Sequence, residues 1–391
     1  MKALAAGENL LLNLALALMA LIPLAEALLR AVFNVGVSGS ASLVQHLCLV
    51  VGMVGGAVAA RENRLLSLAT TELLPEGPWK TPARIFASSF AAAIAATLAV
   101  AAWQFTSVER QAGHILAYGI RAWMVQLVMP AGFALVAARL IWHAAKAWKW
   151  RAAALSLAVA MACAAAYWPA SPHTMSVIGL GALLLATVSG APIFTTLGGA
   201  ALLLFWGAGE PIAILPIEHY QLVTNPSLPT IPLFTLAGYF LAEGGASARL
   251  VRVFNALVGQ FRGGPAIVTA LVCAFFTSFT GASGVTILAL GGLLMPVLIG
   301  ARYSERAALG LLTGAGSLGL LFPPCLPLIL YGIIANVPIE RMFLGGILPG
   351  TLLVILTAWW GVRQGPRVTS SQRFSAREAG AALWEAPPCQ H

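Results

Sequence analysis

The stretch Gly316–Gly332, GSLGLLFPPCLPLILYG, is apolar enough to lie in a membrane, yet it contains Pro323, Pro324 and Pro327. A proline inside a helix costs about 3 kcal/mol and removes a backbone donor. Irregular backbone at membrane depth is tolerated only where it is buried in protein or lines a wet cavity. We therefore expect a broken helix, whose freed carbonyls and N–H groups can contact a small cation and an anionic group respectively. A simple packing kink is the alternative.

The composition around this stretch is that of a membrane protein. Of 391 residues, 59% are hydrophobic and only 9% are charged, whereas soluble proteins carry roughly 25% charged residues. Apolar runs of spanning length recur along the chain, so we predict an all-α polytopic membrane protein. The expected spans before the break are about Leu10–Phe33, Leu43–Ala60, Ile85–Thr106, Trp123–Trp142, Ala152–Trp168, Met175–Val188, Ile193–Trp206 and Ile231–Leu241.

Three further segments lie between these spans. Leucines between Leu65 and Leu74 favour a short helix in the membrane interface, and residues 209–229 form a polar, proline-rich link. Apolar residues recur at helical spacing in ASARLVRVFNALVGQF, residues 246–261, which predicts an amphipathic helix lying flat on the membrane. An ordinary surface connector is the alternative for that last segment.

The sequence lacks the usual signs of an enzyme or a metal protein. All thirteen acidic residues are glutamates, so paired aspartates and a Ser-His-Asp triad are excluded. The five cysteines show no metal-binding spacing, and the basic residues do not form a groove for nucleic acid. A membrane-embedded enzyme would need His, Glu or Cys gathered at a cavity, and no such constellation is visible. We predict no enzymatic activity.

A second irregular site is predicted upstream of the proline break. Arg262 and Arg302 bracket an almost uncharged stretch that, as one helix, would be close to twice the ~30 Å hydrocarbon thickness. The stretch must double back at FTSFTGASGVT, Phe276–Thr286. We interpret Pro265–Ile299 as a re-entrant hairpin, because this hydroxyl-rich tip offers no interfacial anchor. A contact between small residues of two ordinary helices is the alternative.

The hairpin tip and the proline break together could form a neutral cage for sodium. Hard cations prefer oxygen ligands, and backbone carbonyls with threonine and serine hydroxyls supply them without any carboxylate. Ser283, Thr286 and Ser317 are the candidate sodium ligands. The candidate ion and substrate site comprises Thr280, Gly281, Ser283, Thr286, Gly316, Ser317, Gly319, Pro323, Pro324, Cys325 and Pro327.

The distribution of basic residues predicts the orientation. With the amino terminus in the cytoplasm and the hairpin opening inward, 18 of the 22 Lys and Arg residues lie at the inner side. Only Arg30, Arg110, Arg121 and Arg341 fall elsewhere. The count supports an even number of crossings between Arg262 and Arg302. Two full spans in place of the hairpin would give the same result. We predict a multi-pass protein of the bacterial inner membrane.

The chain resembles the large membrane subunit of tripartite ATP-independent periplasmic (TRAP) transporters. Three stretches carry the resemblance, in order: IPLFTLAGYFLAEGGASARLVRVFNALVGQFRGGPAIVTALVCAFFTSFTGASGVT, GSLGLLFPPCLPLILYG and FLGGILPG. The resemblance covers about Met175–Ala386, and several motifs occur in order. The first four spans resemble the family's small subunit. The implied organisation is a small-subunit-like scaffold (1–150), a joining helix (151–172), large-subunit scaffold and arm helices (173–262), the hairpin and broken helix of a transport domain (263–337), and a further span with the cytoplasmic end (338–391).

The resemblance implies a function. Such permeases import an organic acid, coupled to sodium and with no other cofactor, and the substrate is delivered by a separate periplasmic binding protein. It also implies an elevator mechanism in which the small subunit and the flat helices form the scaffold. A scaffold that does not transport is the alternative.

The chain departs from the family pattern in three places. The family's hairpin typically reads GSSAAT, where this chain has GASGVT from Gly281, so the hydroxyl at Ala282 is lost. Cys325 replaces the serine of the usual PPS. The family's large subunit is an inverted repeat, and only its first half is recognisable here before PPCQH. We expect a truncated reading frame, or a second half of the large subunit that is encoded separately and acts as a partner.

Overall fold

The computed structural model describes residues 2–68, 80–145, 147–167, 172–258, 261, 263–281 and 283–365. Across these ranges the regular structure is helical, and the only β-pairing is two isolated bridges, Ser67 with Pro192 and Ile115 with Arg121. The predicted all-α fold is confirmed. The chain divides into two compact units, 1–226 and 227–391. This division lies inside the predicted segment 173–262, and the predicted domain boundaries stay predictions.

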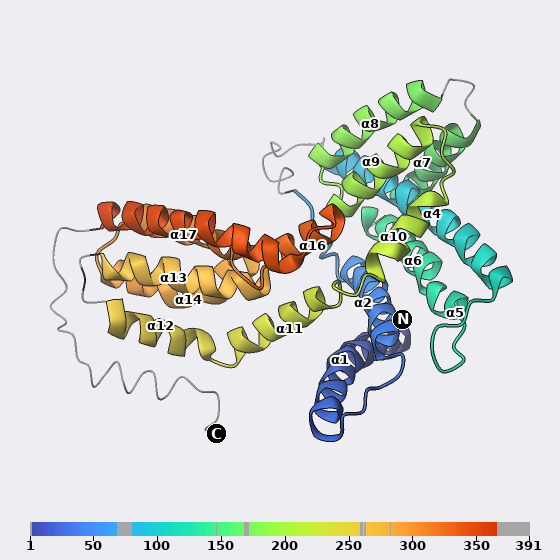
Figure 1. Cartoon of the computed structure of the whole chain (residues 1–391). Coiled ribbons are helices and arrows are strands. Elements are labelled where there is room, and N and C mark those ends of the chain that lie inside the picture. The colour runs from blue at the N-terminus through green and yellow to red at the C-terminus, as the bar shows by residue number, and fades with distance from the viewer. Residues whose placement is uncertain are drawn as a thin grey trace. The chain divides into compact units, whose positions relative to one another are not determined.

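The first unit is built around one long helix, α4. The helices of this unit are α1 (Lys2–Phe33), α2 (Ser40–Arg61), α4 (Lys80–Ala112), α5 (Ala122–Gln126), α6 (Val128–Ala144), α7 (Trp148–Tyr167), α8 (Pro172–Val188), α9 (Ile193–Gly207) and α10 (Ile214–Val223) (Figure 1). Helix α4 packs against α5 to α10, most extensively against α6. Its middle, Ala91–Ala95, consists of four alanines and Ile94, and all five residues are buried. Small side chains allow close helix contacts in lipid, where burial of apolar surface gives no driving force.

A cluster of charges joins α1, α2 and α6 at the end of the bundle where α1 begins. Glu8 accepts a hydrogen bond from Arg61 Nη1 at 2.7 Å and another from Arg139. Arg61 Nη2 also donates to Asn9 Oδ1 at 2.7 Å, and Arg139 Nη1 donates to the Ala57 carbonyl at 2.6 Å. The side chains of Glu8 and Arg139 are only 12% exposed. One carboxylate thus bridges two arginines from different helices.

An uncharged contact joins α2 to α10. His46 Nδ1 lies 2.7 Å from the Ser42 carbonyl, which can only accept, so Nδ1 carries the proton. Nε2, 2.7 Å from the Tyr220 hydroxyl, therefore accepts a hydrogen bond from it. Phe105 of α4 packs on the Tyr220 ring.

The second unit surrounds helix α13. Its helices are α11 (Thr230–Glu243), α12 (Ala246–Val258), α13 (Gly264–Thr280), α14 (Ser283–Gly300), α15 (Glu305–Ala315), the short 3₁₀ helix η1 (Leu318–Leu321), α16 (Leu326–Ala335) and α17 (Ile339–Gln364). Helix α13 packs against all of the others, and α13, α14 and α17 run side by side in Figure 1. The predicted amphipathic helix is α12, and the buried Val251 on its apolar face packs into the same core as α13. Part of that face therefore meets protein.

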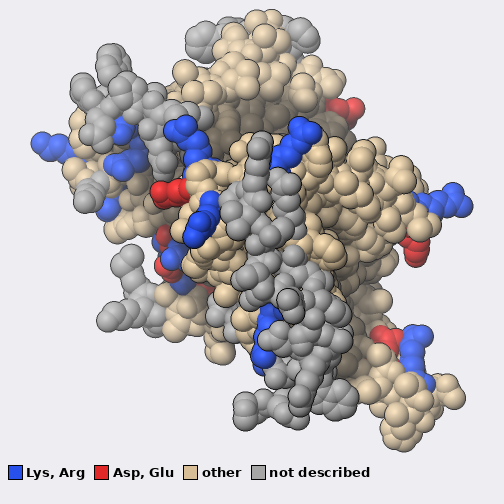
Figure 2. Space-filling view, turned by 90° about the vertical axis from the view of Figure 1, so that its left-hand side faces the viewer, with Lys and Arg blue, Asp and Glu red and all other residues tan. Residues whose placement is uncertain are grey.

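The helices have the dimensions of membrane spans. Within the described residues, five are long and apolar enough to cross a membrane: Leu4–Phe33, Ser40–Arg61, Lys80–Ala112, Ala122–Ala144 and Ile339–Gln364. Glu305–Leu321 and Leu326–Ala335 form a sixth, broken candidate, bent by 40°. On the face that Figure 2 presents, charged side chains cover little of the described surface, and some blue and red groups lie next to one another. The chain is a multi-pass membrane protein.

One sequence expectation is wrong over the residues that the structure describes. Residues 65–68 are not helical, because the left-handed Asn63 (φ 54°) follows the end of α2 and the Leu66 carbonyl accepts a hydrogen bond from Ile193 N at 2.8 Å. The rest of that predicted interfacial helix, including Leu74, lies outside the described residues. The proline-rich link 209–229 contains helix α10. Pro216 is tolerated there because it lies in the first turn, where N–H groups have no helical partner.

Candidate functional site

The predicted hairpin is present as α13 and α14, joined by a tight turn. Helix α13 ends at Thr280, and Gly281 adopts a left-handed conformation (φ 63°) with its N–H bonded to the Thr277 carbonyl at 2.8 Å. A Cβ on Gly281 would lie 2.7 Å from Leu326 Cγ. The turn therefore rests against the first residue of α16. Each arm is ~26 Å long, somewhat shorter than the ~30 Å hydrocarbon core, and the re-entrant placement stays a prediction.

The proline break is also present, and the prolines lie at helix boundaries. Helix α15 starts at the cap Ser304, whose hydroxyl accepts from Ala307 N at 3.3 Å, and η1 follows it. Phe322 is extended (ψ 143°), as a residue before proline should be. The cis-linked pair Pro323–Pro324 precedes α16, and Pro327 occupies the first turn of α16. No helical hydrogen bond is lost at these positions, so the chain can change direction at little cost.

The hairpin and the break are in direct contact. Gly319 of η1 lies so close to α13 that an added Cβ would overlap the Ala274 carbonyl and lie 2.6 Å from Thr277 Cβ. A Cβ on Gly316 would lie 2.7 Å from Ile287 Cγ1 of α14. On the other side of η1, Gly346 and Gly350 of α17 lie against Leu321. Glycines on both sides thus let η1 fit between α13 and α17.

A cluster of threonine hydroxyls lies at this contact. Thr277 Oγ1 is 2.7 Å from the Cys273 carbonyl, 2.9 Å from the Gly316 carbonyl and 3.1 Å from Thr286 Oγ1. Thr286 Oγ1 is also 2.9 Å from Thr280 Oγ1. All three threonines are at least 95% buried. A hydroxyl carries one proton, so three protons serve these four oxygen–oxygen contacts, and at least one contact is without a proton.

The structure brings together some of the predicted site residues. Thr280 and Thr286 are in the cluster, and Gly281, Gly316 and Gly319 provide the close approach around it. Ser317 is exposed, and its hydroxyl donates to the Gly314 carbonyl at 3.0 Å. No contact joins Ser283 to the cluster within the described residues. Ala282 lies outside them.

The central residue of the cluster, Thr277, is absent from the predicted set of site residues. It lies three residues before Thr280, hence on the same face of α13, and this spacing could have indicated it.

Cys325 takes a structural role at the break. Its thiol is buried, and it donates a hydrogen bond to the Leu320 carbonyl at the end of η1. The Cys325 side chain therefore satisfies the Leu320 carbonyl, a backbone acceptor at the irregular break.

We expect Cys325→Ser to retain the stability of the protein, because the hydroxyl is a stronger donor of similar reach. Cys325→Ala removes the donor and should cost about 1 kcal/mol. Thermal unfolding of the purified chain in detergent measures both variants. Equal losses for serine and alanine would show that the thiol contact does not matter.

The fold and this contact define a class of protein: a helical membrane protein in which a hairpin and a broken helix meet in the bilayer-spanning region. The family model "Tripartite ATP-independent periplasmic transporter, DctM component" matches residues 180–389, and "Tripartite ATP-independent periplasmic transporters, DctQ component" matches residues 19–150. The chain belongs to the TRAP transporter family, with both membrane components fused in one polypeptide. The predicted fusion is confirmed.

Three relatives illustrate the match. The C4-dicarboxylate TRAP transporter large permease protein DctM of Vibrio cholerae is 35% identical over 42% of this chain and 37% of its own length. The isethionate TRAP transporter permease protein DctMQ of Oleidesulfovibrio alaskensis is 30% identical over 66% of this chain and 42% of its own. The ectoine TRAP transporter large permease protein TeaC of Halomonas elongata is 30% identical over 52% and 49%. The chain spans less than half the length of these relatives. They are named as permeases, which are transporters and not enzymes.

Proposed function

We propose that the chain is the membrane component of a sodium-coupled secondary transporter that imports a small organic acid delivered by a periplasmic binding protein. Membership of the TRAP family supports this assignment. The relatives carry names that refer to C4-dicarboxylates, isethionate and ectoine. The substrate class is therefore a small organic molecule with an acidic group.

The threonine cluster supports sodium coupling. Its ligand atoms would be the hydroxyls of Thr277, Thr280 and Thr286 and the carbonyls of Cys273 and Gly316. These oxygens have too few protons to hydrogen-bond to one another at every contact. Their lone pairs can instead act as ligands of a hard cation such as sodium. One observation carries the proposal: Thr277 Oγ1 lies 2.9 Å from the Gly316 carbonyl, so the cluster joins the hairpin to the broken helix. A cation bound there would favour the closed contact between them.

We expect sodium to raise the apparent melting temperature of the purified chain relative to potassium at the same ionic strength. A ligand that binds only the folded state adds about 2.7 kcal/mol at a concentration 100-fold above its Kd. Thr277→Val and Thr286→Val each remove one oxygen and should abolish most of the shift. Ser283→Ala and Ser317→Ala test the ligands predicted from the sequence, and we expect these two variants to keep the shift.

Thr313→Val is the matched control. Thr313 is exposed, and its hydroxyl bonds only to the Leu309 carbonyl of its own helix, at 2.8 Å. It should retain the full sodium shift. A wild-type protein indifferent to sodium would instead support the scaffold that does not transport. If Thr313→Val also lost the sodium shift, the loss in Thr277→Val and Thr286→Val would reflect general destabilisation and not a missing sodium ligand.

A further inference from the structure

Tryptophans and basic residues gather where α6 ends and α7 begins. We define the α6–α7 corner by five residues: Trp142, Trp148, Lys149, Trp150 and Arg151. The segment Ala122–Ala144, which ends in α6, is long and apolar enough to span a membrane. The corner therefore lies at the level of a membrane surface. In the orientation predicted from the basic residues, this is the cytoplasmic surface.

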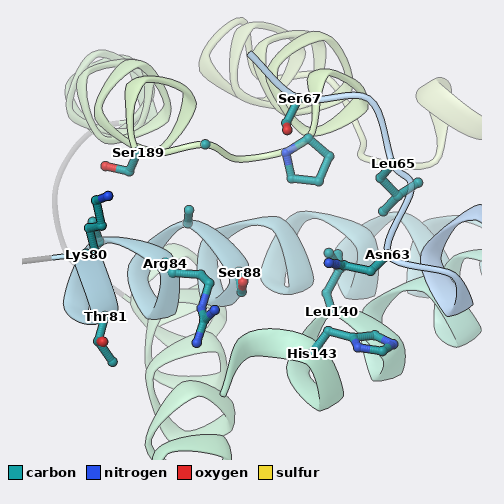
Figure 3. A pocket seen from close by; sticks show the side chains of 14 residues that line it. Asn63, Leu65, Ser67, Lys80, Thr81, Arg84, Ser88, Leu140, His143 and Ser189 are labelled. Atoms are coloured by element: carbon teal, nitrogen blue, oxygen red, sulfur yellow. The ribbon is translucent and has the colours of Figure 1, made fainter. Parts of the chain in front are cut away.

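Two arginines hold the end of α6 in place. Arg151 Nε donates a hydrogen bond to the Ala145 carbonyl at 2.8 Å, and Arg84 Nε of α4 donates one to the Ala144 carbonyl at 3.1 Å. Figure 3, a view into the cavity beside this end of α6, shows Arg84 reaching from α4 toward the last turn of α6, which carries His143. Carbonyls at the end of a helix lack helical partners and favour a cation. The backbone of α6 thus fixes the position of the Arg151 guanidinium.

The Arg151 side chain also stacks on an aromatic ring. Its guanidinium carbon lies 4.2 Å from the centroid of the Trp142 ring, which is a cation–π contact. Stacking occupies a face of the guanidinium, and the bond to the Ala145 carbonyl uses Nε. The two Nη atoms carry further N–H groups in the same plane. Such paired N–H groups match two oxygens of a phosphate.

The three tryptophans of the corner are well exposed on the protein. The exposed fractions are 46% for Trp142, 72% for Trp148 and 52% for Trp150. An indole is poorly placed in water because most of it is apolar, and poorly placed in hydrocarbon because its N–H group needs an acceptor. The headgroup level of a membrane meets both needs, and tryptophan is enriched there. The exposed rings therefore indicate contact with lipid headgroups.

The charge of this part of the sequence favours anionic headgroups. No acidic residue occurs in the sequence between Glu109 and Glu210, whereas Lys146, Lys149 and Arg151 follow one another closely. Basic residues next to a membrane span attract anionic lipids through their summed field. This attraction does not require every basic side chain to point at one headgroup.

We propose that the α6–α7 corner binds the headgroup of an anionic phospholipid, with Arg151 as the donor to the phosphate and the exposed tryptophans beside it at the headgroup level. Lys149 adds to the positive field. The lipid anchors the end of α6 and the start of α7 at one membrane surface. This role is independent of the proposed transport function.

Native mass spectrometry of the purified full chain tests the proposal by comparing the retention of phosphatidylglycerol with that of zwitterionic phosphatidylcholine. We expect the wild type to retain phosphatidylglycerol preferentially. Arg151→Gln should bind it about fivefold more weakly, the effect of one basic residue near a membrane surface. Lys149→Gln should also weaken binding. Because Lys149 is exposed, this variant replaces Arg151→Gln if circular dichroism shows that the latter does not fold.

Arg110→Gln is the matched control. The Arg110 guanidinium carbon also lies over a tryptophan, 5.2 Å from the centroid of the Trp123 ring, and the substitution removes the same charge. Arg110 is in the last turn of α4, whereas Arg84, near the start of α4, contacts the end of α6. Arg110 therefore lies at the opposite membrane surface. We expect this variant to retain phosphatidylglycerol as the wild type does.

Three results would overturn the proposal. One is equal retention of phosphatidylglycerol and phosphatidylcholine by the wild type. Another is a loss of binding in Arg110→Gln as large as that in Arg151→Gln, which would show a general effect of net charge. The third comes from thermal unfolding in inorganic phosphate against chloride at equal ionic strength. A stabilisation by phosphate that Arg151→Gln abolishes, without any lipid preference, would assign the corner to free phosphate and not to a lipid.

Discussion

Gly319→Ala should lower the stability of the protein more than any other small-residue change near the proline break. The added Cβ would overlap the Ala274 carbonyl and Ser278 N of α13, and it would lie 2.6 Å from Thr277 Cβ. Two of these are backbone atoms of a packed helix, so they cannot rotate away. Overpacking of this kind costs about 1–3 kcal/mol, and we expect the upper end of that range. Thermal unfolding in detergent measures the loss.

The matched control is Gly314→Ala in the neighbouring helix α15. A Cβ on Gly314 meets no atom within 4 Å, so alanine should be neutral or stabilise the helix by up to about 1 kcal/mol. Because Gly319→Ala forces η1 away from Thr277, it should also abolish any sodium shift. Equal stabilities for the two variants would contradict the close contact of η1 with α13.

Glu8→Gln should produce the second large effect, in the first unit. The substitution keeps the size of the side chain but leaves Arg61 and Arg139 close together without their shared carboxylate. Removal of one partner from a buried ion pair costs about 3–5 kcal/mol. The three side chains are 12–20% exposed, so we expect about 2 kcal/mol. The melting temperature should fall accordingly, and less so at high salt.

Glu62→Gln provides the comparison, because Glu62 bonds to the same arginine. It accepts from Arg61 Nε at 3.0 Å, but its side chain is 53% exposed. Exposed pairs contribute about 0–1 kcal/mol, so the variant should be nearly as stable as the wild type. If the two glutamine variants lost the same stability, the bridge formed by Glu8 would not be what holds α1 to α2 and α6.

The irregular membrane segments were predictable because few residue patterns permit them. The length of uncharged chain between Arg262 and Arg302 required a reversal, and the structure places it at Gly281. Pro323 and Pro324 required a break, and η1 with the extended Phe322 forms it.

What the sequence could not predict depends on contacts between distant segments. Helix α10 has no strong apolar period, and it is stabilised by packing on α2 and α4. The leucines at 65–68 resemble an amphipathic helix, but pairing of Leu66 with Ile193, far along the chain, keeps them extended. Thr277 became central only because Gly316, 39 residues later, packs against it. Periodicity describes one helix at a time and does not reveal such partners.

The hydrogen bond between His46 and Tyr220 joins the part of the chain that matches the small component to the part that matches the large one. On two separate chains, such surfaces would have to find each other by diffusion. Here the covalent connection through α7 fixes their effective concentration at a high value. Even a modest set of uncharged contacts then suffices for permanent assembly. We infer that fusion relaxes the demand for affinity at this interface and keeps the two components in equal numbers.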